Sequence, residues 1–519
     1  MEVFDITKTL VLKNKYIDEI ALSKIAYELS KIDGVDSVFA AMATPEKRIK
    51  SLSYGFSRAV SEKLKSNDLM FSISSESLNT EGLALDFVSQ LERAGDYRKV
   101  RYVKSVEYAK TLHEGANLAV VSVPSGHAVR EAQKCLRLGM NVMLMSSVSI
   151  EDEARLKIEA KERGLVLFGH KCGGGIIDGV PLGFAAPTKN GTVAVVSSSA
   201  LCVNSLCAYV EAAGGGISQA VHVGKRESMV EINFISTKLF LDMLCKSGTT
   251  SSAIVHLRQS EQNKIDEILE YISALNLPVV VLCAGLSETV MAKYPQINFA
   301  FSLEEAAFVA VRLAGEQALE IGLPKEKMEE LVINCTSGLS ARQCFARGFF
   351  LSGAMCDEAM RVAEPQLTEI YSNIPIRPIN KIYDSKMSKE NTFLDFGDSA
   401  FEYGTLPHYI NQSKRNRRIL EESSNKTVAA IIADCFSGER FGERAVEELA
   451  ATIDSAKSRA TTEQRDIVVI VALTAPNEGK YSFDAAKTTL ENAGAVVFES
   501  IADAAGLCAA VTRRTKDAD

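Results

Sequence analysis

Three consecutive serines, Ser197, Ser198 and Ser199, lie between an apolar run and an amphipathic segment. Residues 192–196 have the composition of a buried strand, and the segment that starts at residue 200 predicts a helix. The unpaired amides and the dipole at a helix start attract phosphate or carboxylate groups. Two interpretations stay open: the loop binds the anionic part of a cofactor, or Ser199 simply caps the helix.

A second polar loop contains His170, Lys171, Cys172 and Gly173, and two more glycines follow it. A cation beside glycines could hold an anion, because a backbone without side chains can approach a ligand closely. The same composition is typical of a loop that only makes a turn. The loop is therefore a second cofactor-binding candidate, with a turn as the alternative.

His408 and Arg415 are the catalytic candidates, because an arginine can bind a phosphate or carboxylate through two parallel hydrogen bonds. The alternative is that Arg415 belongs to the solvated start of a basic helix at residues 414–418. Two other histidines, His222 and His256, lie within apolar strand patterns, which favours packing over catalysis.

The sequence does not predict a metal site. Its eleven cysteines are scattered without a Cys-x-x-Cys pair, and most of them lie in apolar segments. Asp395 and Asp398 follow an apolar pair and could orient a substrate or a metal. Two acids in a turn more commonly accept hydrogen bonds from the backbone, and this is the favoured interpretation.

Alternating strands and helices must position these residues. Between residues 98 and 190 the alternation has the spacing of βαβ units, which predicts a parallel, Rossmann-like sheet. Ligands of such sheets bind at the carboxyl ends of the strands. This rule places residues 122–126, 146–147 and 170–175 along one rim.

Four domains are predicted, and together they make the chain a multidomain α/β protein. They are a small N-terminal α+β domain at 1–97, the Rossmann-like domain at 98–190, a second doubly wound domain at 191–322 and a C-terminal α/β domain at 323–519. The first part of the last domain, up to residue 395, is predicted to be less regular because prolines mark turns there. Residues 495–511 repeat the pattern of 297–313, which indicates an internal duplication.

The net charge of -8, without a long block of like charges, argues against nucleic acid and anionic membranes as partners. The apolar runs are shorter than the roughly 20 residues of a membrane helix. The N-terminus lacks the pattern of a signal peptide. A cytoplasmic protein that binds small molecules or other proteins is expected.

Nearly the whole chain, from about residue 16 to 511, resembles the FdrA family of acyl-CoA-synthetase-like proteins. The resemblance is carried by residues 35–45, 117–157, 169–184, 191–224, 392–398 and 407–408. It implies a CoA-binding-type Rossmann domain, then a flavodoxin-like ligase-type domain related to the succinyl-CoA synthetase alpha subunit, and a further α/β domain. FdrA proteins are also similar to a subunit implicated in oxamate carbamoyltransferase. The implied ligand is CoA or another phosphate-bearing molecule.

The chain departs from the FdrA pattern at several loops. The usual Gly-Ala-Ser-Gly-Thr-Gly reads Ser-Ser-Ser-Ala-Leu-Cys at 197–202, and Ser205 replaces an acid in the following helix. Each lost glycine adds a Cβ, and a backbone with positive φ would be strained there. Residues 284–287, where a synthetase presents its phosphorylated histidine, contain no histidine, a lack that FdrA proteins share. The Cys-Gly-Gly-Thr loop is altered at 351–354, and a carboxylate is lost at 407–411.

These departures favour a catalytically degenerate FdrA-like subunit. Such a subunit would be a structural or regulatory partner in an acyl-CoA-ligase-like or carbamoyltransferase-like complex, with other subunits or with copies of itself. The competing hypothesis is an active subunit that binds phosphate or CoA at 197–202, with His408 and Arg415 at the substrate. A third hypothesis is a small-molecule sensor that uses the Rossmann rim.

Overall fold

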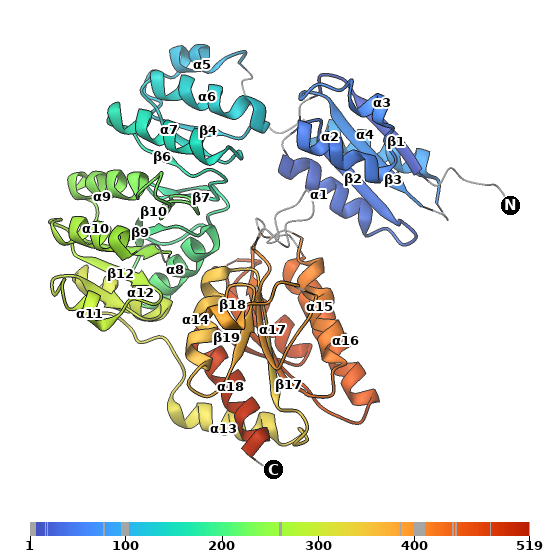
Figure 1. Ribbon diagram of the computed structural model, residues 1–519, viewed down its shortest axis with the longest axis vertical. Helices are drawn as coiled ribbons and strands as arrows, with labels where there is room; N and C mark the ends of the chain where they lie inside the picture. The colour runs from blue at the N-terminus through green and yellow to red at the C-terminus, as the bar shows by residue number, and fades with distance from the viewer. Residues whose placement is uncertain are drawn as a thin grey trace. The chain divides into compact units, whose positions relative to one another are not determined.

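The computed structural model describes residues 7–15, 17, 19–75, 78–94, 103–258, 262–384, 386–398, 411–438, 441, 444–477 and 479–517. The chain is a multidomain α/β protein with parallel sheets and a small N-terminal α+β domain, as predicted. The described residues divide into two compact units, one that ends at Lys171 and one that begins at Cys172. Figure 1 shows the helices and strands of both units.

The N-terminal domain is an antiparallel sheet of three strands in the order β1-β3-β2. Phe71 of β3 and Phe87 of α4 stack with their ring centroids 3.8 Å apart, which anchors the helical layer to the sheet. The elements are β1 (Thr7–Leu12), α1 (Glu19–Ser30), β2 (Ser37–Met42), α2 (Pro45–Ser51), the 3-10 turn η1 (Leu52–Tyr54), α3 (Arg58–Ser61), β3 (Leu69–Ser74) and α4 (Thr80–Ala94).

The same unit contains a parallel sheet of three strands, β4-β5-β6, which confirms the predicted Rossmann-like alternation. A cluster of buried apolar residues from the strands and from α6 and α7 forms its core. The elements are α5 (Val106–Leu112), β4 (Leu118–Val121), α6 (Ser125–Arg137), β5 (Asn141–Leu144), α7 (Ile150–Glu162) and β6 (Leu167–Phe168).

In the second unit, residues 172–313 build a seven-stranded sheet in the order β13-β12-β11-β9-β10-β7-β8, called here the seven-stranded half. Strands β9 to β13 are parallel, and the hairpin β7-β8 adds two antiparallel strands next to β10. The strands are β7 (Gly174–Ile177), β8 (Val180–Gly183), β9 (Asn190–Ser197), β10 (Ile217–His222), β11 (Ser252–Leu257), β12 (Val279–Cys283) and β13 (Asn298–Ala300). The helices are α8 (Ala200–Ala212), α9 (Ile235–Ser247), α10 (Gln262–Ser273), α11 (Glu288–Met291) and α12 (Leu303–Leu313).

After α13 (Lys325–Thr336), residues 345–517 build a parallel sheet in the order β15-β16-β14-β17-β18-β19, called here the six-stranded half. Helices α14 and α18 pack against each other, as do α15 and α16 (Figure 1). The strands are β14 (Phe345–Phe350), β15 (Ile370–Ser372), β16 (Asn391–Asp395), β17 (Val428–Phe436), β18 (Val468–Thr474) and β19 (Ala495–Phe498). The helices are α14 (Gly353–Ala363), the 3-10 turn η2 (Pro378–Asn380), α15 (Ser413–Ser423), α16 (Ala445–Thr462), α17 (Phe483–Asn492) and α18 (Ile501–Asp517).

The prediction of a less regular segment before residue 395 is wrong, because β14, α14 and β16 lie there. These elements complete a second copy of one strand order. In the seven-stranded half the order β10-β9-β11-β12-β13 puts the first parallel strand between the second and the third. The order β16-β14-β17-β18-β19 repeats it when the additional parallel strand β15, which pairs with β16 at the edge of the sheet, is set aside. This is the flavodoxin-like order. Helices α8 and α14 therefore follow equivalent strands, and so do α12 and α18.

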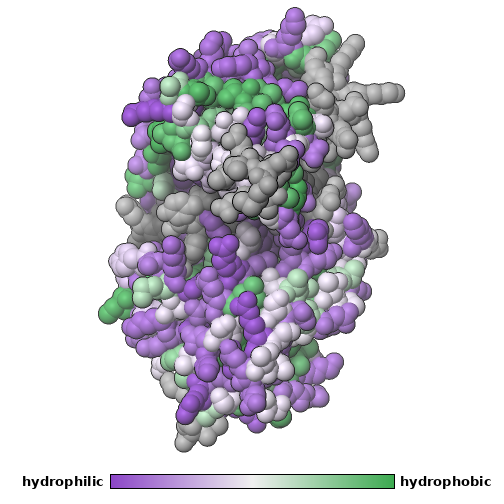
Figure 2. Space-filling model, turned by 90° about the vertical axis from the view of Figure 1, so that its right-hand side faces the viewer, coloured by the Kyte–Doolittle hydropathy of each residue, from purple (hydrophilic) through white to green (hydrophobic). Residues whose placement is uncertain are grey.

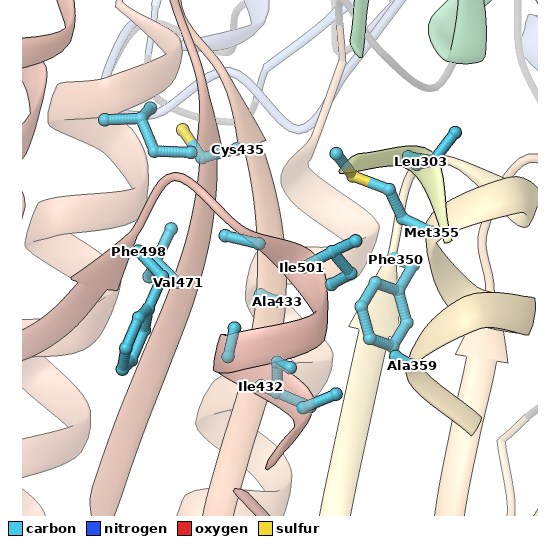
Figure 3. Close-up of a cluster of buried hydrophobic side chains, with 14 of the residues drawn as sticks. Leu303, Phe350, Met355, Ala359, Ile432, Ala433, Cys435, Val471, Phe498 and Ile501 are labelled. Carbon is cyan, nitrogen blue, oxygen red and sulfur yellow. The ribbon is translucent and has the colours of Figure 1, made fainter. Parts of the chain in front are cut away.

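One continuous core of buried apolar side chains includes residues of both halves. Figure 3 shows Leu303 of α12 in the same cluster as Met355 of α14 and Ile501 of α18. On the face shown in Figure 2, hydrophilic residues predominate, a band of apolar residues crosses the upper part, and smaller apolar patches lie elsewhere. Within the described ranges, no helix is long and apolar enough to cross a membrane.

Candidate functional site

The serine loop joins β9 to α8 at the carboxyl edge of the seven-stranded sheet. Ser197 is the last residue of β9, and Ser199 precedes the first helical residue, Ala200. The Ser199 side chain makes no capping hydrogen bond, and its φ of -134° is ordinary extended backbone. No residue from 197 to 202 has a positive φ. The loss of the glycines therefore brings no backbone strain, and α8 begins without a side-chain cap.

Ser197 is bonded to a histidine of the neighbouring strand. His256 lies opposite Ser197 in the parallel β11–β9 register, and its Nδ1 is 2.9 Å from the Ser197 hydroxyl. The same hydroxyl accepts a hydrogen bond from the Ser199 amide at 3.1 Å. Burial, together with the positive charge of Arg258, lowers the pKa of His256 to about 4. The imidazole is neutral at pH 7, so this pair offers dipoles to a ligand and no net charge.

His222 connects the serine loop with part of the glycine-rich loop. Its Nδ1 accepts a hydrogen bond from the Gly173 amide at 2.9 Å, so the ring proton lies on Nε2, which is 3.3 Å from the Ser198 carbonyl oxygen. The Cys172 thiol donates to the His222 carbonyl oxygen at 3.2 Å. A Cβ on Gly173 would lie 2.3 Å from the Cβ of Ala200, so only glycine fits here. Both ring nitrogens of His222 are used within the fold, in agreement with its predicted packing role.

His170 and Lys171 belong to the other unit. The His170 amide donates to Glu153 Oε1 at 3.2 Å, and the Lys171 amide donates to the Ser146 carbonyl oxygen at 3.1 Å. The Ser146 hydroxyl in turn accepts a hydrogen bond from the Val123 amide at 2.8 Å. These bonds gather part of the predicted Rossmann rim at the carboxyl ends of β4 and β5, whereas residues 172–175 of that rim belong to the other unit, where Gly174 and Gly175 lie in β7.

The start of α14 is occupied by a carboxylate of the protein itself. Asp434 of β17 accepts hydrogen bonds from the Leu351 amide at 2.7 Å and from the Ser352 amide at 2.8 Å. Arg415 Nη1 lies 3.6 Å from Asp434 Oδ1, and both side chains are completely buried. Burial raises the pKa of Asp434 to about 6, against the lowering effects of Arg415 and the two amides. The loop amides that an anion would meet are thus already bonded.

Arg415 uses its guanidinium inside the protein. It donates to Asn416 Oδ1 at 2.9 Å, to Gln412 Oε1 and to the Asp434 carbonyl oxygen. Arg415 is only 1% exposed, so it is not part of a solvated helix start. Its predicted companion His408 lies outside the described residues.

Asp395 lies at the end of β16, beside α14 and near two cations of the seven-stranded half. Its Oδ1 accepts a hydrogen bond from the Gly397 amide at 2.8 Å, and a Cβ on Gly353 would lie 2.6 Å from its Oδ2. Lys225 Nζ donates to the Gly397 carbonyl oxygen at 3.2 Å. Burial raises the pKa of Asp395 to about 7, while Gly397, Lys225 and Arg258 oppose the shift. The turn-capping interpretation describes this residue, and its charged neighbours were missed because strand order is not visible in the sequence.

Two family models match the chain. Residues 349–511 match the CoA-ligase family, and residues 3–100 match the domain described as AllF, heavy metal-associated domain. The uncharacterized protein YahF of Escherichia coli (strain K12) is 30% identical over 497 residues, which cover 95% of this chain and 96% of YahF. The chain belongs to the YahF family.

The YahF-family chain also has similar solved structures. One is the apo form of a dinucleotide-forming acetyl-coenzyme A synthetase 1 from Ca. Korarchaeum cryptofilum. The match covers 81% of this chain and 88% of the synthetase chain, with 16% identity and a TM-score of 0.34. PH0766 from Pyrococcus horikoshii OT3 has the same coverage and identity and a TM-score of 0.35. The CoA-ligase match falls on the six-stranded half and makes this YahF-family member acyl-CoA-synthetase-like.

The heavy-metal description of the N-terminal domain does not fit the residues present. Residues 3–100 contain no cysteine and no histidine, and their two methionines, Met42 and Met70, are buried in the core. Soft heavy metals are bound through thiolate, thioether or imidazole groups. No group of three or more potential His, Cys, Asp or Glu ligands occurs in the described part of the chain.

Proposed function

We propose that this chain is an FdrA-like subunit of an acyl-CoA-ligase-like or carbamoyltransferase-like complex, and that it serves there as a structural or regulatory partner without a phosphoryl relay of its own. The CoA-ligase match and the AllF-type N-terminal domain support this assignment. The resemblance to FdrA proteins extends over nearly the whole chain. The eleven cysteines are all free thiols, which supports a cytoplasmic location.

The observation that carries the proposal is the carboxylate at the start of α14. An incoming phosphate would have to displace Asp434 from the Leu351 and Ser352 amides. Displacement would also leave Arg415 without its buried counterion, and uncompensated buried charge is costly. The absence of a histidine from residues 284–287 supports the same conclusion.

Thermal unfolding with and without ligands tests the proposal. The ligands are CoA, acetyl-CoA, ATP, inorganic phosphate and carbamoyl phosphate. A ligand present at about one hundred times its dissociation constant stabilises a protein by about 2.7 kcal/mol, so even moderate binding is visible. We expect ATP and the CoA compounds to leave the midpoint unchanged, and we expect the chain to co-purify with other subunits from its host. Acyl-CoA formation by the isolated chain would overturn the proposal.

A second candidate function is an active subunit that binds phosphate or the phosphate of CoA at residues 197–202. One observation favours it: the Ser198 hydroxyl is buried and has no hydrogen-bond partner among the described residues. It lies in the loop whose helix, α8, begins without a side-chain cap. Stabilisation of the wild type by inorganic phosphate, and its loss in Ser198→Ala, would establish this candidate in place of the first.

A further inference from the structure

Two glutamates are buried where the two halves of the second unit meet. Glu304 lies in the first turn of α12, and Glu358 lies in α14. They are only 7% and 6% exposed. No site described above uses either residue.

Each glutamate bonds to the start of a helix that belongs to the other half. Glu358 Oε2 accepts a hydrogen bond from the amide of Leu303, the first residue of α12, at 3.0 Å. Glu304 Oε1 accepts a hydrogen bond from the Ala502 amide, in the first turn of α18, at 3.4 Å. Each half thus accepts a hydrogen bond from a helix start of the other half. The two helices, α12 and α18, are the equivalent last helices of the two repeated strand orders. These contacts hold the two halves together through amides at the helix starts, which have no hydrogen-bond partner within their own helices.

Tyr209 of α8 makes a third bond of this kind. Its hydroxyl donates to the Glu499 carbonyl oxygen at 3.0 Å and accepts a hydrogen bond from the Ile501 amide at 3.2 Å. The first amides of α18 are therefore bonded to residues of the seven-stranded half. Leu303 and Ile501, the first residues of the two helices, both lie in the apolar cluster of Figure 3.

Among the residues that the structure describes, the second oxygen of each carboxyl group has no partner except the other glutamate. Glu304 Oε2 and Glu358 Oε1 are buried and lack a conventional hydrogen-bond partner among the described residues. Two buried carboxylates cannot face each other while both are ionised, but one proton satisfies both oxygens. The titratable groups around the pair are Cys202 and Tyr209 from α8, Asp357 from α14, and Glu499 and Asp503 at the start of α18. They are acids, so they add no counterion.

We propose that Glu358 and Glu304 share one proton, and that this proton locks the seven-stranded half to the six-stranded half. The Glu358 Oε1–H group donates to Glu304 Oε2, while the other two oxygens keep their helix amides. Burial, followed by the nearby Glu304 carboxylate, raises the pKa of Glu358 well above its usual value. When the pH rises far enough to remove the proton, two carboxylates face each other and the contact weakens.

The substitution Glu358→Gln tests the proposal, because it replaces the proton with a permanent donor. The amide oxygen of the glutamine can accept from Leu303, and its NH2 group can donate to Glu304. We expect the unfolding midpoint of the wild type to fall relative to that of E358Q as the pH rises from 6 to 9, by about 3 °C or more. The control is Glu330→Gln, an exposed glutamate of α13, which should follow the wild type at every pH.

Parallel curves for the wild type and E358Q would overturn the proposal. If E358Q does not fold, Glu304→Gln provides the same test, because its amide can accept from Ala502 and donate to Glu358. Hydrogen exchange of the wild type gives an independent measurement. After correction for the intrinsic effect of pH, the Leu303 and Ala502 amides should lose protection together on alkalinisation, and unchanged protection of both would contradict the shared proton.

Discussion

The starts of α8 and α14 are equivalent positions in two sheets of the same strand order, yet their surroundings differ in charge. The α8 start faces serine hydroxyls and neutral imidazoles. The α14 start faces two buried carboxyl groups, Asp434 on the loop amides and Asp395 against Gly353. The amides of Ser198 and Ser199 bond to the His256 carbonyl oxygen and the Ser197 hydroxyl, so one scaffold carries a helix start with neutral partners and another that holds an anion of its own. The ligase-type fold can therefore be retained while a buried carboxylate of the protein occupies one of its two helix starts.

The largest expected effect comes from removing the cation that holds the α14 carboxylate. Arg415→Ala leaves the buried carboxylate of Asp434 without its counterion. We therefore expect a loss of about 3–5 kcal/mol in the free energy of unfolding. Chemical denaturation measures it. Arg417→Ala, an exposed arginine of the same helix, is the control and should change stability by less than about 0.5 kcal/mol. A loss below 1 kcal/mol in R415A would mean that Asp434 is not held as described.

A methyl group on the loop beside α8 tests how tightly this loop packs against the start of the helix. Gly173→Ala would place its Cβ within 2.3 Å of the Ala200 Cβ. We expect a cost of about 1–3 kcal/mol from overpacking, measured by thermal unfolding. Gly126→Ala, where nothing lies within 4 Å of the added carbon, is the matched control and should not destabilise the protein. Equal stability of the two variants would show that the loop can move away from α8.

The two helix starts should respond to pH with opposite signs. The pKa of Asp395 is raised to about 7, so its contribution to stability is complete below its unfolded value near 4 and is lost as the pH rises through 7. The pKa of His256 is lowered to about 4, so its contribution is complete above about 6.5 and is lost as the pH falls through 4.

Unfolding midpoints between pH 4 and 8 measure both effects. Asp395→Asn should reduce the loss of stability on the alkaline side, and His256→Gln should reduce the loss on the acid side, each by about 1 kcal/mol or more. Arg417→Ala again serves as the control. If both substitutions shifted the pH profile in the same direction, the contrast between the helix starts would be wrong.

The smallest effect is expected at the serine loop. Ser198→Ala removes a buried hydroxyl that has no partner among the described residues, so without ligand it should stabilise the protein slightly, by about 0.5 kcal/mol. Ser199→Ala is the control, because the Ser199 side chain makes no capping bond. A clear destabilisation by S198A alone would indicate that the Ser198 hydroxyl makes a hydrogen bond within the protein. The argument for a ligand at this hydroxyl would then be lost.

The sequence predicted the α/β alternation and the location of the serine loop at a sheet edge. It failed at β14, where Arg347 and Gly348 interrupt an otherwise apolar strand. That arginine is buried because Glu422, 75 residues later, lies 2.7 Å away. No local pattern shows such an ion pair, so the strand and the helix after it were missed.

The candidate site was predicted only in part for the same reason. Arg415 was interpreted as a substrate clamp or a solvated residue, but its partner Asp434 comes from β17 and makes it structural in this fold. His256 meets Ser197 only because β11 lies next to β9. Partners of this kind depend on strand order, and a single sequence gives the strands without their order.

Hydrogen exchange with and without ligand at residues 350–355 tests the central claim most directly. Exchange is measured in the presence of saturating inorganic phosphate, CoA or carbamoyl phosphate, and residues 197–202 are followed in the same experiment. The account predicts no change at 350–355 with any of the three ligands, because Asp434 already occupies the amides of Leu351 and Ser352. Ligand-dependent protection of residues 350–355 would contradict it.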